Sequence, residues 1–172
     1  MNIVDFSKQN SVINQYVAEL RDVDYQKNRK LFRENLIRIG QMMAFEVSKT
    51  LNYQIKEVTT PLGVAKTSTF TDDIVVATIF RAGLPFHQGF LDVFDKADNA
   101  FVSAYRYYMD KECEQVGIKI EYIASPDLNG KTLIIADPML ATGGSMAAAI
   151  QALLEIGTPK HVHIACVLAV TA

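Results

Sequence analysis

The sequence predicts an α/β domain with a doubly wound, mostly parallel sheet, flanking helices, N-terminal helices and a projecting β-hairpin. Two observations predict this class. Strand-like apolar runs alternate with helical patterns over short connections, which is typical of parallel sheets with crossover helices. The runs at residues 74–80 and 131–136 are almost continuously apolar, as in strands covered on both faces. With 172 residues, of which 49% are hydrophobic, the chain is expected to form a single domain over residues 1–172.

The N-terminal part predicts two helices followed by two strands. Apolar residues recur at helical spacing from Asn10 to Leu20 and again from about Tyr25 to Leu51. Residues 53–58 and 64–70 favour strands, and the Pro-Leu-Gly turn between them joins the two into a hairpin. We expect this hairpin at the edge of the sheet.

The remaining elements alternate between strand and helix. A further hairpin is predicted over residues 105–124, where two strand-favouring arms enclose a polar middle. Besides the two buried runs, the expected elements are a helix over 84–94, a strand over 100–105, a helix over 145–156 and a last strand over 161–170.

Composition and charge exclude several function classes. The net charge of −2 disfavours a protein that grips nucleic acid through its phosphates. The longest apolar run, Ile164 to Val170, is far shorter than the roughly 20 residues that a membrane span needs. The N-terminus lacks the features of a secretory signal, so we expect a cytoplasmic protein. The two cysteines and the pair His161 and His163 lack the further ligands of a metal site, and none is predicted.

The candidate chemistry lies directly after the buried strand at 131–136. That strand delivers Asp137 to the edge of the sheet where α/β proteins bind ligands. Residues 141–145 combine small side chains, two glycines and two hydroxyls at a helix start, which suits a phosphate monoester. The loop at residues 141–145 lacks the Gly-Lys-Ser/Thr ending of a Walker loop and the GxGxxG of a dinucleotide fold. Neither ATP hydrolysis nor NAD binding is therefore indicated. Because a carboxylate accepts hydrogen bonds from sugar hydroxyls, we expect a ribose 5-phosphate here; the alternative is a plain turn with glycines for tight packing.

The segment from Asp137 to Ser145, DPMLATGGS, resembles the signature with which the uracil phosphoribosyltransferase family binds 5-phosphoribosyl 1-diphosphate (PRPP). The similarity extends over nearly the whole chain. Residues 80–84 resemble the family's Arg-Ala-Gly-Leu loop, residues 105–106 its Tyr-Arg step, and residues 31–33 with 38–40 its N-terminal helix. The resemblance implies a type I phosphoribosyltransferase fold and the reaction of uracil with PRPP to give UMP and diphosphate.

The resemblance also implies roles for individual residues. Arg81 and Arg106 are expected on the diphosphate, Asp137 on the ribose hydroxyls and residues 141–145 around the 5-phosphate; the first three are the expected catalytic residues. Mg²⁺ is implied on the diphosphate, and no protein metal ligand is named. The full set expected to bind PRPP is Arg81, Arg106, Asp137, Pro138, Met139, Leu140, Ala141, Thr142, Gly143, Gly144 and Ser145.

The family resemblance further implies a homodimer or higher oligomer, with the hairpin at 105–124 as a contact or a lid. Family members continue into a C-terminal segment that recognises uracil, which we expect to lie outside these residues, so no uracil-binding residue is assigned. Two alternatives stand beside the enzyme: a PRPP-binding regulator of pyrimidine genes, and a degenerate homologue without catalysis. The sequence does not predict whether GTP acts as an effector.

Overall fold

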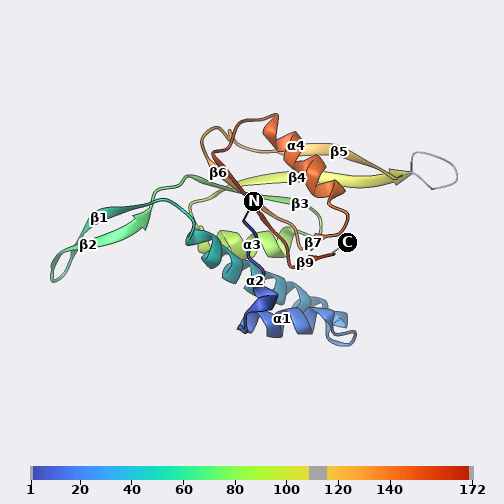
Figure 1. Cartoon of the computed structure of the whole chain (residues 1–172), viewed down its shortest axis with the longest axis horizontal. Coiled ribbons are helices and arrows are strands. Elements are labelled where there is room, and N and C mark those ends of the chain that lie inside the picture. Colours follow the sequence, from blue (N-terminus) through green and yellow to red (C-terminus); the bar gives the residue numbers. More distant parts are fainter. Residues whose placement is uncertain (1, 109–115, 171–172) are drawn as a thin grey trace.

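The computed structural model describes residues 2–108 and 116–170, and the side chains of residues 106–108 and 116 lie outside that description. Its centre is a five-stranded sheet in the order β5-β4-β3-β6-β8 (Figure 1). Four of these strands are parallel and β5 is antiparallel to β4. The strands are β3 (Ile74–Phe80), β4 (Asp98–Tyr108), β5 (Val116–Ala124), β6 (Thr132–Ala136) and β8 (His161–Ala165).

Helices cover both faces of this sheet, which confirms the doubly wound α/β class. Helix α4 lies on one face, and α3 and α2 lie on the other, with α1 packed further out against α2 (Figure 1). The helices are α1 (Val12–Arg21), α2 (Arg29–Ser48), α3 (Leu84–Val93) and α4 (Gly144–Leu154), with short 3₁₀ turns η1 (Phe6–Lys8) and η2 (Tyr25–Lys27). Within the ranges described, no helix is long and apolar enough to cross a membrane.

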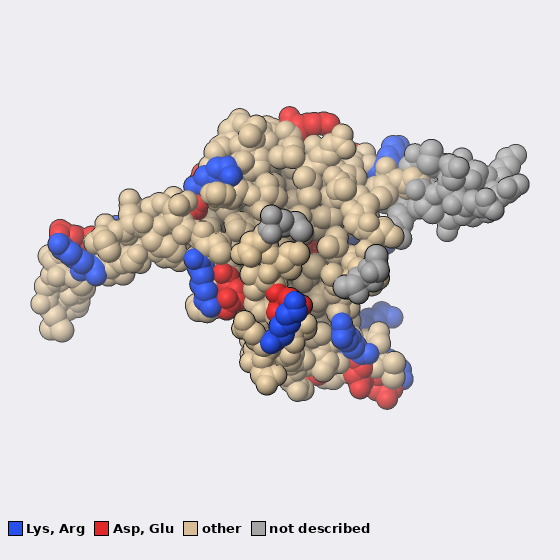
Figure 2. All heavy atoms as spheres, in the orientation of Figure 1, with Lys and Arg blue, Asp and Glu red and all other residues tan. Residues whose placement is uncertain are grey.

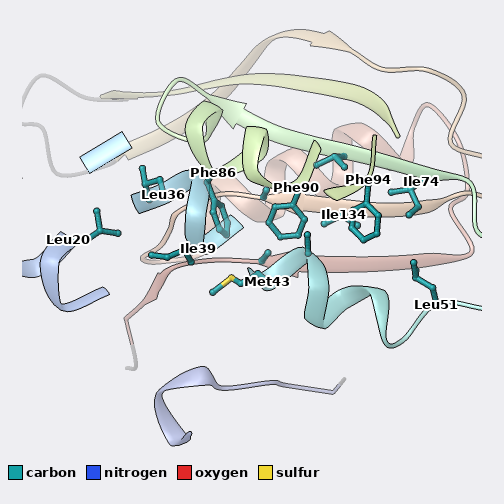
Figure 3. Close-up of a cluster of buried hydrophobic side chains, with 14 residues drawn as sticks. Leu20, Leu36, Ile39, Met43, Leu51, Ile74, Phe86, Phe90, Phe94 and Ile134 are labelled. Atoms are coloured by element: carbon teal, nitrogen blue, oxygen red, sulfur yellow. The ribbon is translucent and has the colours of Figure 1, made fainter. Parts of the chain in front are cut away.

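The core has two layers because successive residues of a strand face opposite sides of the sheet. On β3, Ile74 and Val76 face the helices α2 and α3, while Val75 and Ala77 face α4. Figure 3 shows the first layer, in which Phe86 and Phe90 of α3 lie between Ile39 of α2 and Ile134 of β6. The expected burial of β3 and β6 on both faces is therefore confirmed.

Helix α2 begins later than its apolar pattern indicates. The pattern predicts a start near Tyr25, but the helix starts at Arg29. The side chain of Asn28 accepts hydrogen bonds from the backbone N–H groups of Lys30 and Leu31, both at 3.2 Å, and so caps the first turn. Residues 25–27 form the separate turn η2.

The hairpin of β1 (Tyr53–Thr60) and β2 (Gly63–Phe70) lies away from the main sheet, so its expected place at the sheet edge is wrong. The two strands pair only with each other and project as an arm (Figure 1). Most of their side chains are exposed, and Figure 2 shows one group of charged side chains near the end of the arm. Alternation predicts a strand, but it does not specify the strand's partner.

The strand expected over 100–105 and the first arm of the hairpin expected over 105–124 form one continuous strand, β4, which pairs with β5; the register has an irregularity between Ser103 and Ala104. The tip of the hairpin, residues 109–115, lies outside the described residues, and the expected role of this hairpin as a contact or a lid stays a prediction. The arm extends in the direction opposite to the β1–β2 hairpin (Figure 1).

The single last strand expected over residues 161–170 is wrong. Strand β8 ends at Ala165, and β9 (Leu168–Ala169) pairs with β7 (Met139–Leu140) in a small parallel sheet of its own. The carbonyl of Pro138 accepts hydrogen bonds from the N–H groups of Val167 and Leu168, at 3.2 and 3.0 Å. These bonds hold the loop that follows Asp137 against the end of β8.

Candidate functional site

A cleft of about 200 Å³ lies at the carboxyl ends of β3 and β6. Neighbouring parallel strands end at the same edge of a sheet, where α/β folds bind their ligands. The walls of the cleft come from the turn after β3, the middle of β4 and the loop between β6 and α4. The lining residues are Ile79, Phe80, Arg81, Ala82, Ala104, Asp137, Met139, Leu140, Ala141, Thr142, Gly143, Gly144, Ser145 and Met146.

The turn between β3 and α3 presents Arg81 at the mouth of the cleft. Strand β3 ends at Phe80, whose ring stacks on Phe101 with 5.1 Å between centroids, and Gly83 precedes the first residue of α3. Arg81 is exposed, and the Phe80–Arg81 peptide bond is cis. An exposed guanidinium keeps its charge and offers several N–H donors, which suits the oxygens of a diphosphate.

The start of α4 forms the second wall. Gly143 precedes this helix with a φ of 78°, in the left-handed region that glycine adopts at least cost. Its carbonyl accepts the N–H of Ala147 at 2.8 Å, so the helix begins directly after the loop. The first N–H groups of a helix have no partner within the helix and carry partial positive charge. The wall is therefore suited to a phosphate group.

Asp137 lies between these two walls, directly after β6. Its backbone N–H donates to the carbonyl of Ala165 at 3.1 Å, which fixes it to the end of β8. Burial raises the pKa of Asp137 to about 6. The carboxylate is therefore mostly ionised at neutral pH and able to accept hydrogen bonds from hydroxyl groups.

Cys166 follows Ala165 and belongs to the same surroundings. Burial, and then the negative charge of Asp137, raise the pKa of the Cys166 thiol. Because a thiolate and not a thiol is the nucleophile, this cysteine is not set up for covalent chemistry at neutral pH.

The structure brings most of the sequence-predicted residues together. Arg81 and Asp137 come from adjacent strands, and residues 139–145 line the same cleft. Pro138 is not among the lining residues, and its carbonyl instead holds the β9 connection described above. Arg106 lies on β4 opposite Ile118, and its side chain falls outside the described part of the structure. Its expected role on the diphosphate stays a prediction.

Five lining residues were not in the expected set. Phe80 and Ala82 flank Arg81, Ile79 and Met146 border the two motifs, and Ala104 lies on β4. The one sequence signal near Ala104 is the Tyr-Arg step at residues 105–106 directly after it. Helix α4 also begins close to β5, since a Cβ on Gly144 would lie 2.7 Å from Cδ1 of Ile118.

The side chains that line the cleft do not by themselves form a cage for a metal ion. Among the residues that the structure describes, no group of three or more His, Cys, Asp or Glu side chains could hold one. Asp137 is the carboxylate among the lining residues. This donor set fits a Mg²⁺ ion that takes most of its ligands from a bound diphosphate and from water.

The chain is similar in sequence and in fold to known proteins. The family model described as "Uracil phosphoribosyltransferase" matches residues 7–172. A uracil phosphoribosyltransferase of Porphyromonas gingivalis is 53% identical over 169 residues, which cover 98% of this chain and 77% of the relative. The solved structure of the AQ2163 protein from Aquifex aeolicus superimposes with a TM-score of 0.80 and 31% identity over 92% of this chain and 73% of that one.

A purine phosphoribosyltransferase from Pyrococcus horikoshii shares the fold at lower similarity. It superimposes with a TM-score of 0.53 and 16% identity, over 76% of this chain and 71% of that one. At this identity the likeness concerns the fold alone.

Proposed function

The chain belongs to the uracil phosphoribosyltransferase family, and we propose that the cleft at the ends of β3 and β6 is where it transfers the phosphoribosyl group of PRPP to uracil. In this reaction N1 of uracil forms a bond to the anomeric carbon of the ribose, and the bond from that carbon to the diphosphate breaks. The electron pair of the broken bond leaves with the diphosphate, and N1 loses its proton. The single observation that carries the assignment is that one cleft holds Arg81, Asp137 and the glycine-rich start of α4.

The barrier of this reaction comes mainly from charge separation, since positive charge builds up on the ribose while negative charge grows on the leaving group. Positioned charges and donors are therefore the main means of catalysis. Arg81, exposed at the mouth of the cleft, is placed to bind the diphosphate and stabilise it as it leaves. We assign Arg106 of β4 to the diphosphate as well.

The rest of the cleft holds the part of PRPP that does not leave. The N–H groups at the start of α4, with Thr142 and Ser145 beside them, suit the 5-phosphate. Asp137 lies between this loop and Arg81, where its carboxylate would accept hydrogen bonds from the ribose hydroxyls. Binding at both ends of the molecule holds the ribose still while the bond to the diphosphate breaks.

Mg²⁺ would be held by the oxygens of the diphosphate, with Asp137 as the carboxylate at hand in the cleft. When bound, the ion supplies positive charge that neutralises the leaving diphosphate. The chain's own contribution is the orientation of the phosphates through Arg81 and the loop before α4.

The proposal includes a homo-oligomer, with the β1–β2 arm as the contact between copies. One face of this arm carries the apolar residues Tyr53, Ile55, Val64 and Phe70, and the charged pair Glu57 and Lys66 lies on the same face, between Ile55 and Val64. The four apolar side chains are 41% to 66% exposed. An isolated two-stranded hairpin is marginally stable in water, so the exposed apolar side chains on this face gain stability when a second copy covers them, and the Glu57–Lys66 pair could cross to that copy. The cytoplasmic location stays a prediction from the sequence.

The proposed function is tested by incubating the protein, and any longer natural form of it, with uracil, PRPP and Mg²⁺. We expect UMP to form, and calorimetry to show PRPP binding in the absence of uracil. If the protein and every longer form bind PRPP but make no UMP, the proposed enzymatic function is overturned. Retention of RNA at physiological salt, with loss on mutation of surface lysines, would then favour the PRPP-binding regulator. The family membership and the 53% identity favour the enzyme.

A further inference from the structure

Thr78 is a buried polar residue in the otherwise apolar strand β3. Its side chain is fully buried, and its Oγ1 donates a hydrogen bond of 2.8 Å to the carbonyl of Ala136. Ala136 is paired with Thr78 in the parallel register and directly precedes Asp137. The hydroxyl therefore ties β3 to the last residue of β6 before the proposed ribose-binding carboxylate.

The same hydroxyl lies under the turn that carries Arg81. A Cβ on Gly83 would overlap Oγ1 of Thr78, and it would lie 2.9 Å from the carbonyl oxygen of Ile79 and 3.1 Å from that of Ala136. Only glycine lets the start of α3 approach this closely. The turn after β3 therefore rests on the Thr78 hydroxyl and on the end of β6 at once.

Helix α3 is also held on β3 one turn further on. Nε2 of the buried His87 lies 3.1 Å from the carbonyl of Val76, which places a proton on this nitrogen, because a carbonyl can only accept. The first turn of α3 is thus attached to β3 at Val76 and rests on it at Thr78. The position of the turn that carries Arg81 therefore depends on its packing against Thr78.

We propose that Thr78 is a positioning residue, whose hydroxyl sets the distance between the diphosphate-binding turn at Arg81 and the ribose-binding carboxylate at Asp137. The inference rests on the proposed function. Thr78 does not line the cleft, so it acts through Ala136 and Gly83 and not by touching PRPP. The two groups it links bind opposite sides of the bond that breaks, and a shift of about 1 Å in such a pair lowers a rate by about a hundredfold.

The test compares Thr78→Val, which keeps the branched shape and removes the hydroxyl, with Thr78→Ser, which keeps the hydroxyl. For Thr78→Val we expect kcat/KM for PRPP to fall by about 10- to 100-fold, with KM for uracil nearly unchanged. Thr78→Ser should stay within about threefold of the parent. If Thr78→Val fails to fold, Thr78→Ala removes the same hydroxyl without the added methyl group.

Thr132→Val is the matched control. Thr132 is likewise buried, and its Oγ1 donates at 2.9 Å to Asp72 at the opposite edge of the sheet. Thr132→Val removes this hydrogen bond. It should lower Tm at least as much as Thr78→Val does and leave kcat/KM at the parent value. Equal losses of activity in both variants, or a parent value in Thr78→Val, would overturn the positioning role.

A binding measurement separates this inference from the proposed function. The affinity for PRPP is measured by calorimetry without uracil, so it requires no turnover. If the parent protein binds PRPP and makes no UMP, the proposed function fails, and the inference still predicts weaker binding in Thr78→Val than in Thr132→Val. If the parent makes UMP and both variants bind PRPP and turn over alike, the inference alone fails.

Discussion

The Asp72 carboxylate lies 2.6 Å from Nζ of Lys160, which joins the residue before β8 to the segment before β3. Asp72 also accepts hydrogen bonds from the N–H of Asn52 at 2.6 Å and from Oγ1 of Thr132 at 2.9 Å. Burial alone would raise the pKa of Asp72, but the bonds from Lys160, Asn52 and Thr132 outweigh it and lower the pKa to about 2. This cluster joins the amino ends of β3, β6 and β8, which lie at the end of the sheet opposite the cleft.

Asp72→Asn should therefore destabilise the protein without altering its active site. Because the folded-state pKa lies below the ordinary 3.8, the carboxylate contributes stability above about pH 4 and loses it as the pH falls towards 2. The shift corresponds to about 2 kcal/mol at neutral pH. Urea denaturation at pH 7 and at pH 3 checks the size and the sign. Asp73→Asn is the control, since Asp73 is largely exposed; equal losses in the two variants would contradict the role of the cluster.

Asp137→Asn should abolish most of the activity. An amide keeps the shape of the side chain but cannot offer two charged oxygens to the ribose hydroxyls, so we expect kcat/KM to fall by several powers of ten. In the parent protein, kcat/KM should also fall below about pH 6, where Asp137 becomes protonated. A pH profile of both proteins tests this, and a near-normal rate in Asp137→Asn would refute the assigned role.

The same substitution should stabilise the protein in the absence of substrate. The folded-state pKa of Asp137, about 6, lies above the ordinary 3.8, so ionisation opposes folding. The stability that the protonated Asp137 carboxyl contributes is fully present below about pH 4 and is lost as the pH rises through 6. Asp137→Asn should therefore raise Tm at pH 8 and change it little at pH 4. A lower Tm at pH 8 would show that the carboxylate is held by favourable contacts instead.

Arg81→Ala should lower kcat/KM by several powers of ten, because the diphosphate loses a charged partner as it leaves. Arg81→Lys keeps the charge but not the forked donors, so it should recover only part of the rate. Arg29→Ala removes an exposed arginine at the start of α2 and serves as the control. Steady-state kinetics with varied PRPP distinguish the three, and equal rates in Arg81→Ala and Arg29→Ala would exclude the role.

Gly143→Ala and Gly130→Ala form a matched pair. Both glycines have a left-handed φ, of 78° and 70°, and a Cβ at either would meet no atom within 4 Å. Each substitution should therefore cost about 1 to 2 kcal/mol of folding stability through backbone strain alone. Only Gly143 lines the cleft, so only Gly143→Ala should raise KM for PRPP. Parallel denaturation and kinetics check the pair, and a normal KM in Gly143→Ala would remove the loop from the phosphate site.

The β1–β2 arm offers a test of the oligomer. Ile55→Asp with Val64→Asp replaces two exposed apolar side chains on the face that carries Tyr53 and Phe70 with charges, and we expect the mass measured by sedimentation to fall to that of the monomer. Thr67 lies opposite Lys56, on the other face, so Thr67→Asp should leave the mass unchanged. A monomeric parent protein, or an oligomer that survives the double substitution, would contradict the proposed contact.

Local sequence patterns were sufficient to predict most helices and strands and the residues of the motifs. The apolar runs predicted β3 and β6, and the segment from Asp137 to Ser145 predicted a phosphate site, because strand burial and glycine-rich helix starts depend on neighbours in sequence. The start of α2 was missed because a single cap, Asn28, decides it. The arm at residues 53–70 was misplaced because alternation does not reveal which strand lies beside it.

The sequence by itself determined the α/β class, the family and the residue types of the loop that we propose binds the 5-phosphate. The tertiary structure decided what depends on distance between remote segments. It brought Arg81 and Asp137 to one cleft, placed the Thr78 hydroxyl between the segments that carry them, and raised the pKa of Asp137 by burying it. Pairing between β3 and β6 and the closing of α3 over them are long-range contacts, and residue spacing along the chain does not encode them one by one.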